Sequence, residues 1–163
     1  MDNYICINGK KVELTEEQLK QLGIEVPKGN FFERAKLGET YYWISGCGRV
    51  DTVHENDDRF DDMYFLNGNY CTNKSLMEQR ALHETLNRLL WRYSMEHDGD
   101  KIKWGNRTWF KVSYDHEDNE FVVECNDIYE TLGAVFFCTR ETAERAIEEI
   151  VKPFLAEHPG FKF

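Results

Sequence analysis

The pattern of hydrophobic and polar residues divides the chain into three segments, of which the first covers residues 1–38. It opens with an apolar run at residues 4–7, followed by Asn8-Gly9, the preferred pair for a two-residue turn, so we predict a β-hairpin. Residues 15–18, Thr-Glu-Glu-Gln, fit a capping box and predict a short helix. Two glycines and a proline within residues 23–29 predict a linker.

The second segment, residues 39–99, predicts two strands and a long helix. Residues 40–44 are all β-branched or aromatic and predict a strand, with a returning strand at residues 49–53. An acidic loop at residues 54–62 and a further extended stretch within 63–71 should follow. Thr72 then caps a helix over about residues 73–97, because apolar residues recur there at spacings of three and four. These residues are Leu82, Leu86, Leu89, Leu90 and Tyr93.

The third segment, residues 100–163, predicts the same order of elements again. Strands at residues 108–112 and 120–125 flank an acidic turn, and a helix is expected from about residue 140. Pro153 should kink or restart this helix, because proline lacks the backbone N–H and its ring clashes with the preceding turn.

The second and third segments resemble one unit used twice. Tyr42-Trp43 and Trp109-Phe110 are 67 residues apart, as are Cys71-Thr72 and Cys138-Thr139. We therefore predict an α+β fold, in which an N-terminal hairpin and short helix precede two repeated antiparallel β-β-β-α units that form one compact domain over residues 39–163. Chance similarity is the alternative, because aromatic strands and threonine caps are common.

Composition and charge narrow the class of protein. Of the 163 residues, 41% are hydrophobic and 14% aromatic, which is enough apolar surface for a packed core. The formal net charge is −10: residues 1–38 contribute 0 (six basic, six acidic), residues 39–99 contribute −5 (6 and 11) and residues 100–163 contribute −5 (8 and 13). A general nucleic-acid binder must neutralise phosphates, so we expect no direct binding of nucleic acid.

The location of the protein follows from what the sequence lacks. No apolar run approaches the roughly 20 residues of a membrane span, and no basic and apolar leader marks a signal peptide. The five cysteines are an odd, scattered set and are expected to be reduced thiols. We therefore expect a cytoplasmic protein that does not bind membranes.

Three sequence motifs support a comparison with a known group of proteins. They are Phe-Glu-Arg at residues 32–34, Gly-x-x-Tyr-Tyr at 38–42, and aromatic-x-Thr-x-Glu-x-Ala-Glu-x-Ala at 137–146. In these motifs the chain resembles small accessory proteins encoded by phages and prophages of Gram-positive bacteria. It departs from that pattern at the start of the first long helix, where Asn-Lys-Ser-Leu-Met stands at residues 73–77. The resemblance carries over no catalytic residue. It implies a protein that acts in an infected or lysogenic host, where some small acidic phage proteins block defence nucleases.

Carboxylates supply the first candidate site. A mimic of DNA needs carboxylates spaced like phosphates over a rigid face, so that it occupies a basic groove. The alternative is a solvated loop that keeps the protein soluble. The candidate partner-binding residues are Asp57, Asp58, Asp61, Asp62, Asp115, Glu117, Asp118, Glu120 and, as an exposed aromatic contact, Trp91.

Metal and nucleophile chemistry find less support in the sequence. The Asp-rich loop lacks the ligand spacing of an EF-hand, and none of the five histidines pairs at zinc-ligand spacing, so we expect no metal and no cofactor. Cys47, between two glycines, is a candidate reactive thiol, but neither a base nor an oxyanion site is evident beside it. Turn formation also explains the two glycines.

Taken together, these features predict a non-enzymatic, phage-type accessory protein that binds and inhibits a host protein through an acidic surface. The partner could be a nuclease or another nucleic-acid-binding defence factor, and self-association stays open. The alternative is a module that binds a nucleotide or other small molecule with aromatic residues between the two units. A weak enzyme that uses Cys47 or the aspartates is a third hypothesis.

Overall fold

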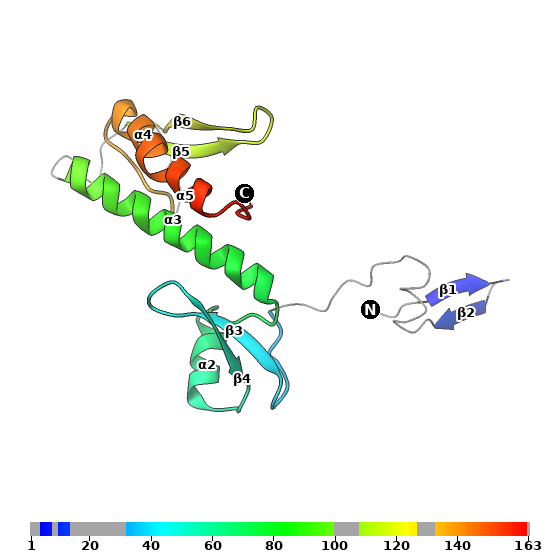
Figure 1. Cartoon of the computed structure of the whole chain (residues 1–163). Coiled ribbons are helices and arrows are strands. Elements are labelled where there is room, and N and C mark those ends of the chain that lie inside the picture. Colours follow the sequence, from blue (N-terminus) through cyan, green and yellow to red (C-terminus); the bar gives the residue numbers. More distant parts are fainter. Residues whose placement is uncertain (1–3, 8–9, 14–31, 100–107, 127–132, 163) are drawn as a thin grey trace. The chain divides into compact units, whose positions relative to one another are not determined.

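The computed structural model describes residues 4–7, 10–13, 32–99, 108–126 and 133–162, and the chain separates into two units, Met1–Glu33 and Arg34–Phe163 (Figure 1). In the first unit, β1 (Tyr4–Ile7) pairs antiparallel with β2 (Lys10–Glu13), and Ile7 lies opposite Lys10. This register confirms the predicted hairpin. The turn residues 8–9, the helix predicted after Thr15 and the linker at 23–29 lie outside the described residues.

The second unit begins with the predicted hairpin of β3 (Thr40–Ile44) and β4 (Val50–His54), which pair antiparallel with Ile44 opposite Val50. Tyr41 is completely buried and packs with Ala35 and Tyr70 in a small core. The aromatic residues Tyr41 and Trp43 of β3 therefore pack in the core of their own hairpin.

The predicted acidic loop and extended stretch over residues 54–71 are wrong in part, because α2 (Arg59–Leu66) lies within them. The carboxylate of Asp58 accepts hydrogen bonds from the backbone N–H of Phe60 (2.7 Å) and of Asp61 (3.1 Å). The Asp61 carboxylate in turn accepts from the backbone N–H of Asp58, which completes a capping box. This reciprocal cap satisfies the free N–H groups of the first turn and starts the helix.

The predicted long helix is confirmed as α3 (Lys74–Asp98). It begins one residue later than expected: Asn73 is the cap, and its side-chain oxygen accepts from the backbone N–H of Leu76 (3.0 Å). Leu86 and Tyr93 of the predicted apolar stripe are buried. Although α3 is long, no helix in the described part of the chain is apolar enough to span a membrane.

A second hairpin and a C-terminal helix complete the second unit. Strands β5 (Trp109–Asp115) and β6 (Glu120–Asn126) pair antiparallel as predicted, and α4 (Arg140–Ala146) starts at the predicted cap, Thr139. Side chains from α3, α4 and both strands meet in one core around Tyr93, Phe137 and Ala143.

The helix changes type ahead of Pro153. A π-helical turn, η2 (Ile147–Val151), follows α4, and α5 (Lys152–Glu157) then starts with Pro153 in its first turn. The backbone N–H of Lys152 donates to the carbonyl of Ile147, five residues back. The restart predicted at Pro153 is confirmed.

Each hairpin of the second unit gains one further backbone pairing. Tyr42 bridges Cys71, and Phe110 bridges Phe137, in both cases just before the cap of the following helix. Each sheet among the described residues nevertheless has two strands. The third strand that we predicted in each β-β-β-α repeat is therefore a single bridge. The structure thus confirms a mixed α and β fold with antiparallel hairpins, whereas the repeat of β-β-β-α units stays a prediction.

Candidate functional site

The first predicted acidic group lies around the guanidinium of Arg34. Arg34 forms ion pairs with Glu55 (2.8 Å), Asp57 (3.1 Å) and Asp62 (2.6 Å). Asp58 caps α2, as described above. We call these residues, together with Asp61, Tyr41 and Tyr70, the Arg34 network.

Asp61 faces the interior of this network. Its side chain is 2% exposed and accepts hydrogen bonds from the hydroxyl of Tyr41 (2.6 Å) and from the backbone N–H of Asn56 (2.8 Å) and Asp58 (3.2 Å). Burial acts to raise the pKa of Asp61, but these hydrogen bonds outweigh it and hold the pKa below its usual range. Asp61 is therefore a structural acceptor, while Asp57, Asp58 and Asp62 remain exposed.

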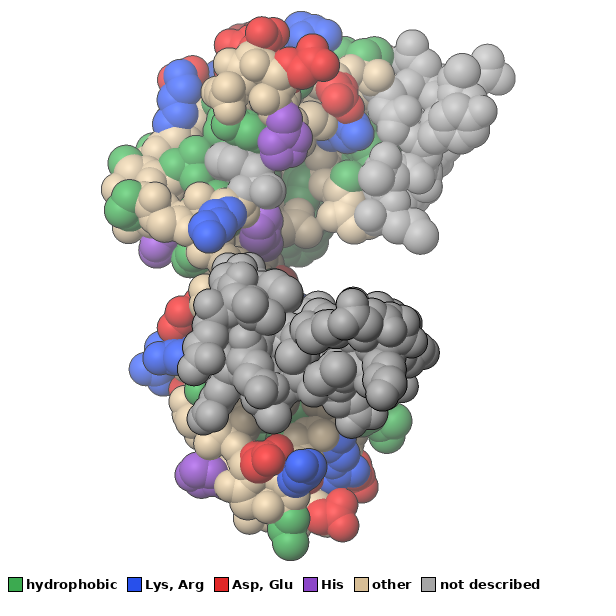
Figure 2. All heavy atoms as spheres, turned by 90° about the vertical axis from the view of Figure 1, so that its right-hand side faces the viewer, with side chains coloured by type: hydrophobic (Ala, Val, Ile, Leu, Met, Phe, Trp, Pro, Cys, Tyr) green, Lys and Arg blue, Asp and Glu red, His purple; other side chains and the backbone are tan. Residues whose placement is uncertain are grey.

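Glu55 is the second buried carboxylate of the Arg34 network, and the sequence analysis did not single it out. It accepts from Arg34 and from the hydroxyl of Tyr70 (2.7 Å), and the bond from Arg34 lowers the pKa of Glu55. The ring of Tyr70 stacks on that of Tyr41 with centroids 4.0 Å apart. Because the guanidinium of Arg34 lies among these carboxylates, this part of the surface is not purely acidic. On the face drawn in Figure 2, acidic and basic side chains likewise stand beside each other on the described surface.

The second predicted acidic group forms the tip of the β5–β6 hairpin. The carboxylate of Asp115 accepts from the backbone N–H of Glu117 (2.8 Å) and of Asp118 (3.3 Å), which fixes the turn. Glu117, Asp118 and Glu120 are exposed. Among the residues that the structure describes, none of these three carboxylates forms an ion pair.

A groove of about 480 Å³ lies between this tip and the C-terminal helix. Its apolar lining comes from Phe121 and Ile147, and its charged lining from three glutamates and one lysine. We call it the acidic groove, and its charged residues are Glu120, Glu144, Glu148 and Lys152. The predicted residue Glu120 thus lines a groove together with Glu144 and Glu148, which the sequence analysis did not identify.

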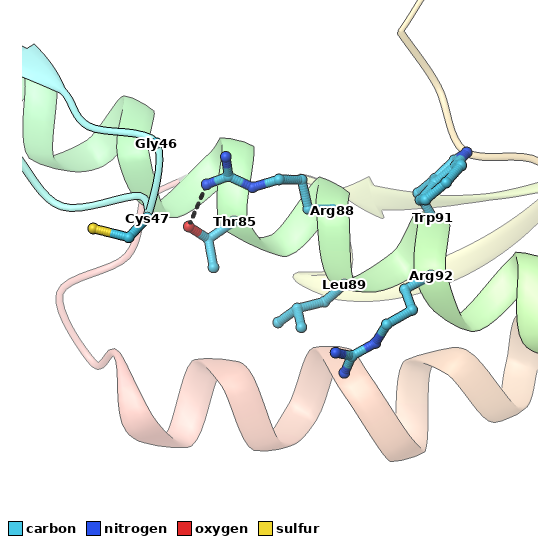
Figure 3. Close-up of a pocket in the computed structure, with 7 residues that line it drawn as sticks. All are labelled: Gly46, Cys47, Thr85, Arg88, Leu89, Trp91 and Arg92. Carbon is cyan, nitrogen blue, oxygen red and sulfur yellow. Dashed lines mark hydrogen bonds between the residues drawn. The ribbon is translucent and has the colours of Figure 1, made fainter.

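Trp91 lies on a different surface, on α3. Its side chain is 58% exposed, and it borders a pocket of about 400 Å³ (Figure 3). We call this the Trp91 pocket. It is lined by Gly46, Cys47, Thr85, Arg88, Leu89, Trp91 and Arg92. The sequence analysis identified Trp91 but missed Arg88 and Arg92, although Arg88 lies three residues before Trp91 and four before Arg92, the spacings of neighbours on a helix surface.

Cys47 lies at the edge of the Trp91 pocket, in the turn between β3 and β4. The Ser45 hydroxyl lies 3.2 Å from its sulfur, and this hydrogen bond, together with Arg49, lowers the pKa of Cys47 to about 7. In Figure 3 the sulfur points away from the side chains of α3. The predicted exposed thiol is therefore present, and it faces outward rather than into the pocket.

Metal binding and known relatives give no further guide. No group of three or more His, Cys, Asp and Glu side chains in the described part of the chain could hold a metal ion. No family model, curated protein or solved structure matches this chain. We therefore infer function from the geometry of the acidic groove and the Trp91 pocket.

Proposed function

We propose that this chain acts by binding a partner protein rather than by catalysis, and that the acidic groove receives a basic segment of that partner. The observation that carries the proposal is the combination of an apolar lining at Phe121 and Ile147 with carboxylates at Glu120, Glu144 and Glu148. Apolar contact supplies the favourable free energy of burial, whereas complementary charge selects the partner and steers its approach.

The existing ion pairs of the groove leave its carboxylates available. Arg140 pairs with Glu144 at 3.9 Å and Lys152 pairs with Glu148, each within one helix and with both side chains largely exposed. Exposed pairs of this kind contribute little, about 0–1 kcal/mol. A lysine or arginine of a partner can therefore replace them at small cost, and Glu117 and Asp118 extend the negative surface beside the groove.

The class of partner follows from charge and from the resemblance to phage accessory proteins. A host protein that handles nucleic acid carries basic segments on its nucleic-acid-binding surface, and an acidic protein bound to them would exclude the nucleic acid. Inhibition of such a defence factor is thus the expected consequence of binding. We place the contact at the β5–β6 tip and the acidic groove, because Glu55 and Asp61 of the Arg34 network are buried and Asp58 caps α2.

The test is a matched pair of charge variants. The tagged chain is used to isolate a partner from a Gram-positive host, and the affinity of the purified pair is then measured by calorimetry. The test variant is Glu120→Gln/Glu144→Gln, and the control is Glu78→Gln/Glu157→Gln on α3 and α5. Each removes two carboxylates and changes the formal net charge from −10 to −8.

The two variants separate local contact from overall charge. We expect the test variant to weaken the complex by about tenfold or more, because truncating one partner of an interfacial charge pair costs a few kcal/mol. The control should bind like the original chain, and the complex should weaken steeply as salt rises. Equal affinities for the two variants would show that the acidic groove is not the contact.

A further inference from the structure

The Trp91 pocket is built from one face of α3 and one turn. Thr85, Arg88, Leu89, Trp91 and Arg92 come from the helix, and Gly46 and Cys47 close one end from the β3–β4 turn (Figure 3). Its volume of about 400 Å³ lies within the range of small-molecule sites, roughly 300–1,000 Å³. A ligand of the size of a mononucleotide therefore fits it better than a folded partner.

The pocket is cationic although the chain is acidic. Arg88 donates to the hydroxyl of Thr85 at 3.3 Å, and among the described residues it forms no ion pair. Arg92 approaches Glu96 only at 3.7 Å, with both side chains well exposed. Arg88 and Arg92 are one helical turn apart in sequence, and in Figure 3 the Arg88 side chain extends toward the β3–β4 turn and the Arg92 side chain toward the C-terminal helix. Both thus keep donors for an anion on two sides of the pocket, and guanidinium groups match phosphate oxygens in a bidentate geometry.

The turn is shaped to leave room for Arg88. Gly48 has φ +83°, and a Cβ atom there would lie 2.8 Å from Nη2 of Arg88 and 3.1 Å from the hydroxyl oxygen of Thr85. Any larger residue at position 48 would displace the guanidinium from its place over the turn. The exposed side chain of Arg88 therefore lies close against the turn.

Trp91 supplies a planar apolar surface beside these charges. It stands at the opposite end of the pocket from the turn in Figure 3, with the backbone of Arg88 between them. An indole ring at such a position is a platform on which a nucleobase stacks, and stacking of this kind tolerates different bases. No other exposed tryptophan occurs among the described residues.

We propose that the Trp91 pocket binds a nucleotide, with the base stacked on Trp91 and the phosphates held by Arg88 and Arg92. The site is separate from the acidic groove, so this inference and the proposed function can fail independently. The net charge of −10 disfavours a long nucleic acid at this site, whereas a single nucleotide carries few charges and meets only the local arginines.

The experiment is calorimetric titration of the full chain with ATP, GTP, adenosine and pyrophosphate. ATP and GTP should bind with similar affinity, and adenosine and pyrophosphate each at least tenfold more weakly, because each fills half of the pocket. Arg88→Gln, Arg92→Gln and Trp91→Leu should each weaken ATP binding by roughly tenfold, as expected for a charge-assisted hydrogen bond or a stacked base. Arg59→Gln, a surface arginine of α2, is the control and should leave the affinity unchanged.

Three outcomes would overturn the proposal. The first is no binding of ATP or GTP at millimolar concentration. The second is pyrophosphate binding as tightly as ATP, which would remove the role of Trp91. The third is unchanged ATP affinity in Arg88→Gln and Trp91→Leu, with far-UV circular dichroism showing that both variants are folded. A protein that binds an acidic peptide but neither ATP nor GTP would also overturn the proposal.

Discussion

Replacement of Asp61 by asparagine tests whether the first acidic group is structural or is a binding surface. Asp61→Asn keeps the shape of the side chain but removes its charge and turns one acceptor oxygen into a donor. The carboxylate accepts three hydrogen bonds, from Tyr41 and from the backbone N–H groups of Asn56 and Asp58. The variant therefore loses at least one of them and weakens the others.

The magnitude follows from the difference between charged and neutral hydrogen bonds. A hydrogen bond to a charged group contributes about 1.5–3 kcal/mol, and a neutral one about 0.5–1.5 kcal/mol. With three bonds affected and a smaller burial penalty for the neutral side chain, we expect Asp61→Asn to lower the free energy of unfolding by about 2–3 kcal/mol. Asp62→Asn, whose side chain is 54% exposed, should cost no more than about 1 kcal/mol despite its ion pair with Arg34.

Urea denaturation followed by circular dichroism measures the free energy of unfolding of both variants. The pH dependence of that free energy provides a second test. The pKa values of Asp61 and Glu55 lie below their usual range in the folded protein. Their stabilisation is therefore complete above the unfolded-state pKa values of about 4 and is lost as the pH falls through the lower folded-state values. The difference between the original chain and Asp61→Asn should shrink over that acidic window. Equal losses for Asp61→Asn and Asp62→Asn at pH 7 would refute the reasoning.

Three further predictions concern single residues. The rate at which iodoacetamide alkylates Cys47 should reach half its plateau near pH 7, because the Ser45 hydroxyl lowers the pKa of the thiol to about 7. Ser45→Ala should therefore shift that midpoint to higher pH. Peptide mass spectrometry measures the alkylation of each cysteine, and an unchanged midpoint in Ser45→Ala would contradict this prediction. Gly48→Ala should lower the melting temperature by more than Gly68→Ala, because both glycines have positive φ but only a Cβ at position 48 would contact Arg88. Equal shifts in melting temperature would show that the Arg88 side chain moves aside at no cost. Thr139→Ala should cost about 1 kcal/mol in urea denaturation through loss of the cap to the backbone N–H of Thr142, whereas Thr139→Ser should cost little, and an equal loss in both would place the effect elsewhere.

The elements predicted correctly are those whose signal is local. The strand at residues 40–44 is a run of β-branched and aromatic residues, and α3 repeats its apolar residues at helical spacing. Thr139 caps α4 as its position implied. In each case the residues that decide the structure are neighbours in the sequence.

The helix α2 was missed because its signal is unusual. Its cap uses two aspartates rather than Ser or Thr with Glu, and Phe60, Met63 and Leu66 are all exposed in the folded chain. Phe60, Met63 and Tyr64 do recur at helical spacing, but a helix of eight residues repeats that pattern too few times to stand out, and only Tyr64 and Phe65 pack against the core. The four aspartates at residues 57–62 therefore looked like a solvated loop.

The candidate sites depend on contacts between distant residues, which pattern cannot supply. Arg34 meets Glu55 and Asp62 across 21 and 28 residues, so the internal role of the aspartates is visible only in the fold. The Trp91 pocket likewise requires the β3–β4 turn to approach α3. The residue types were readable from the sequence at Trp91 and Glu120, but their neighbours were not.

The π-helical turn ahead of Pro153 corrects the phase of the C-terminal helix. The buried residues Ala143, Ile147 and Val151 follow one another at a strict spacing of four, which in an ordinary α-helix rotates each by about 40° past the one before. The wider turn of η2 absorbs part of that rotation, so Val151 and Phe154 both reach the core around Leu86 of α3. Pro153, a residue type that ordinarily interrupts helices, thus follows directly on the π-helical turn, and that turn keeps α5 aligned with α3.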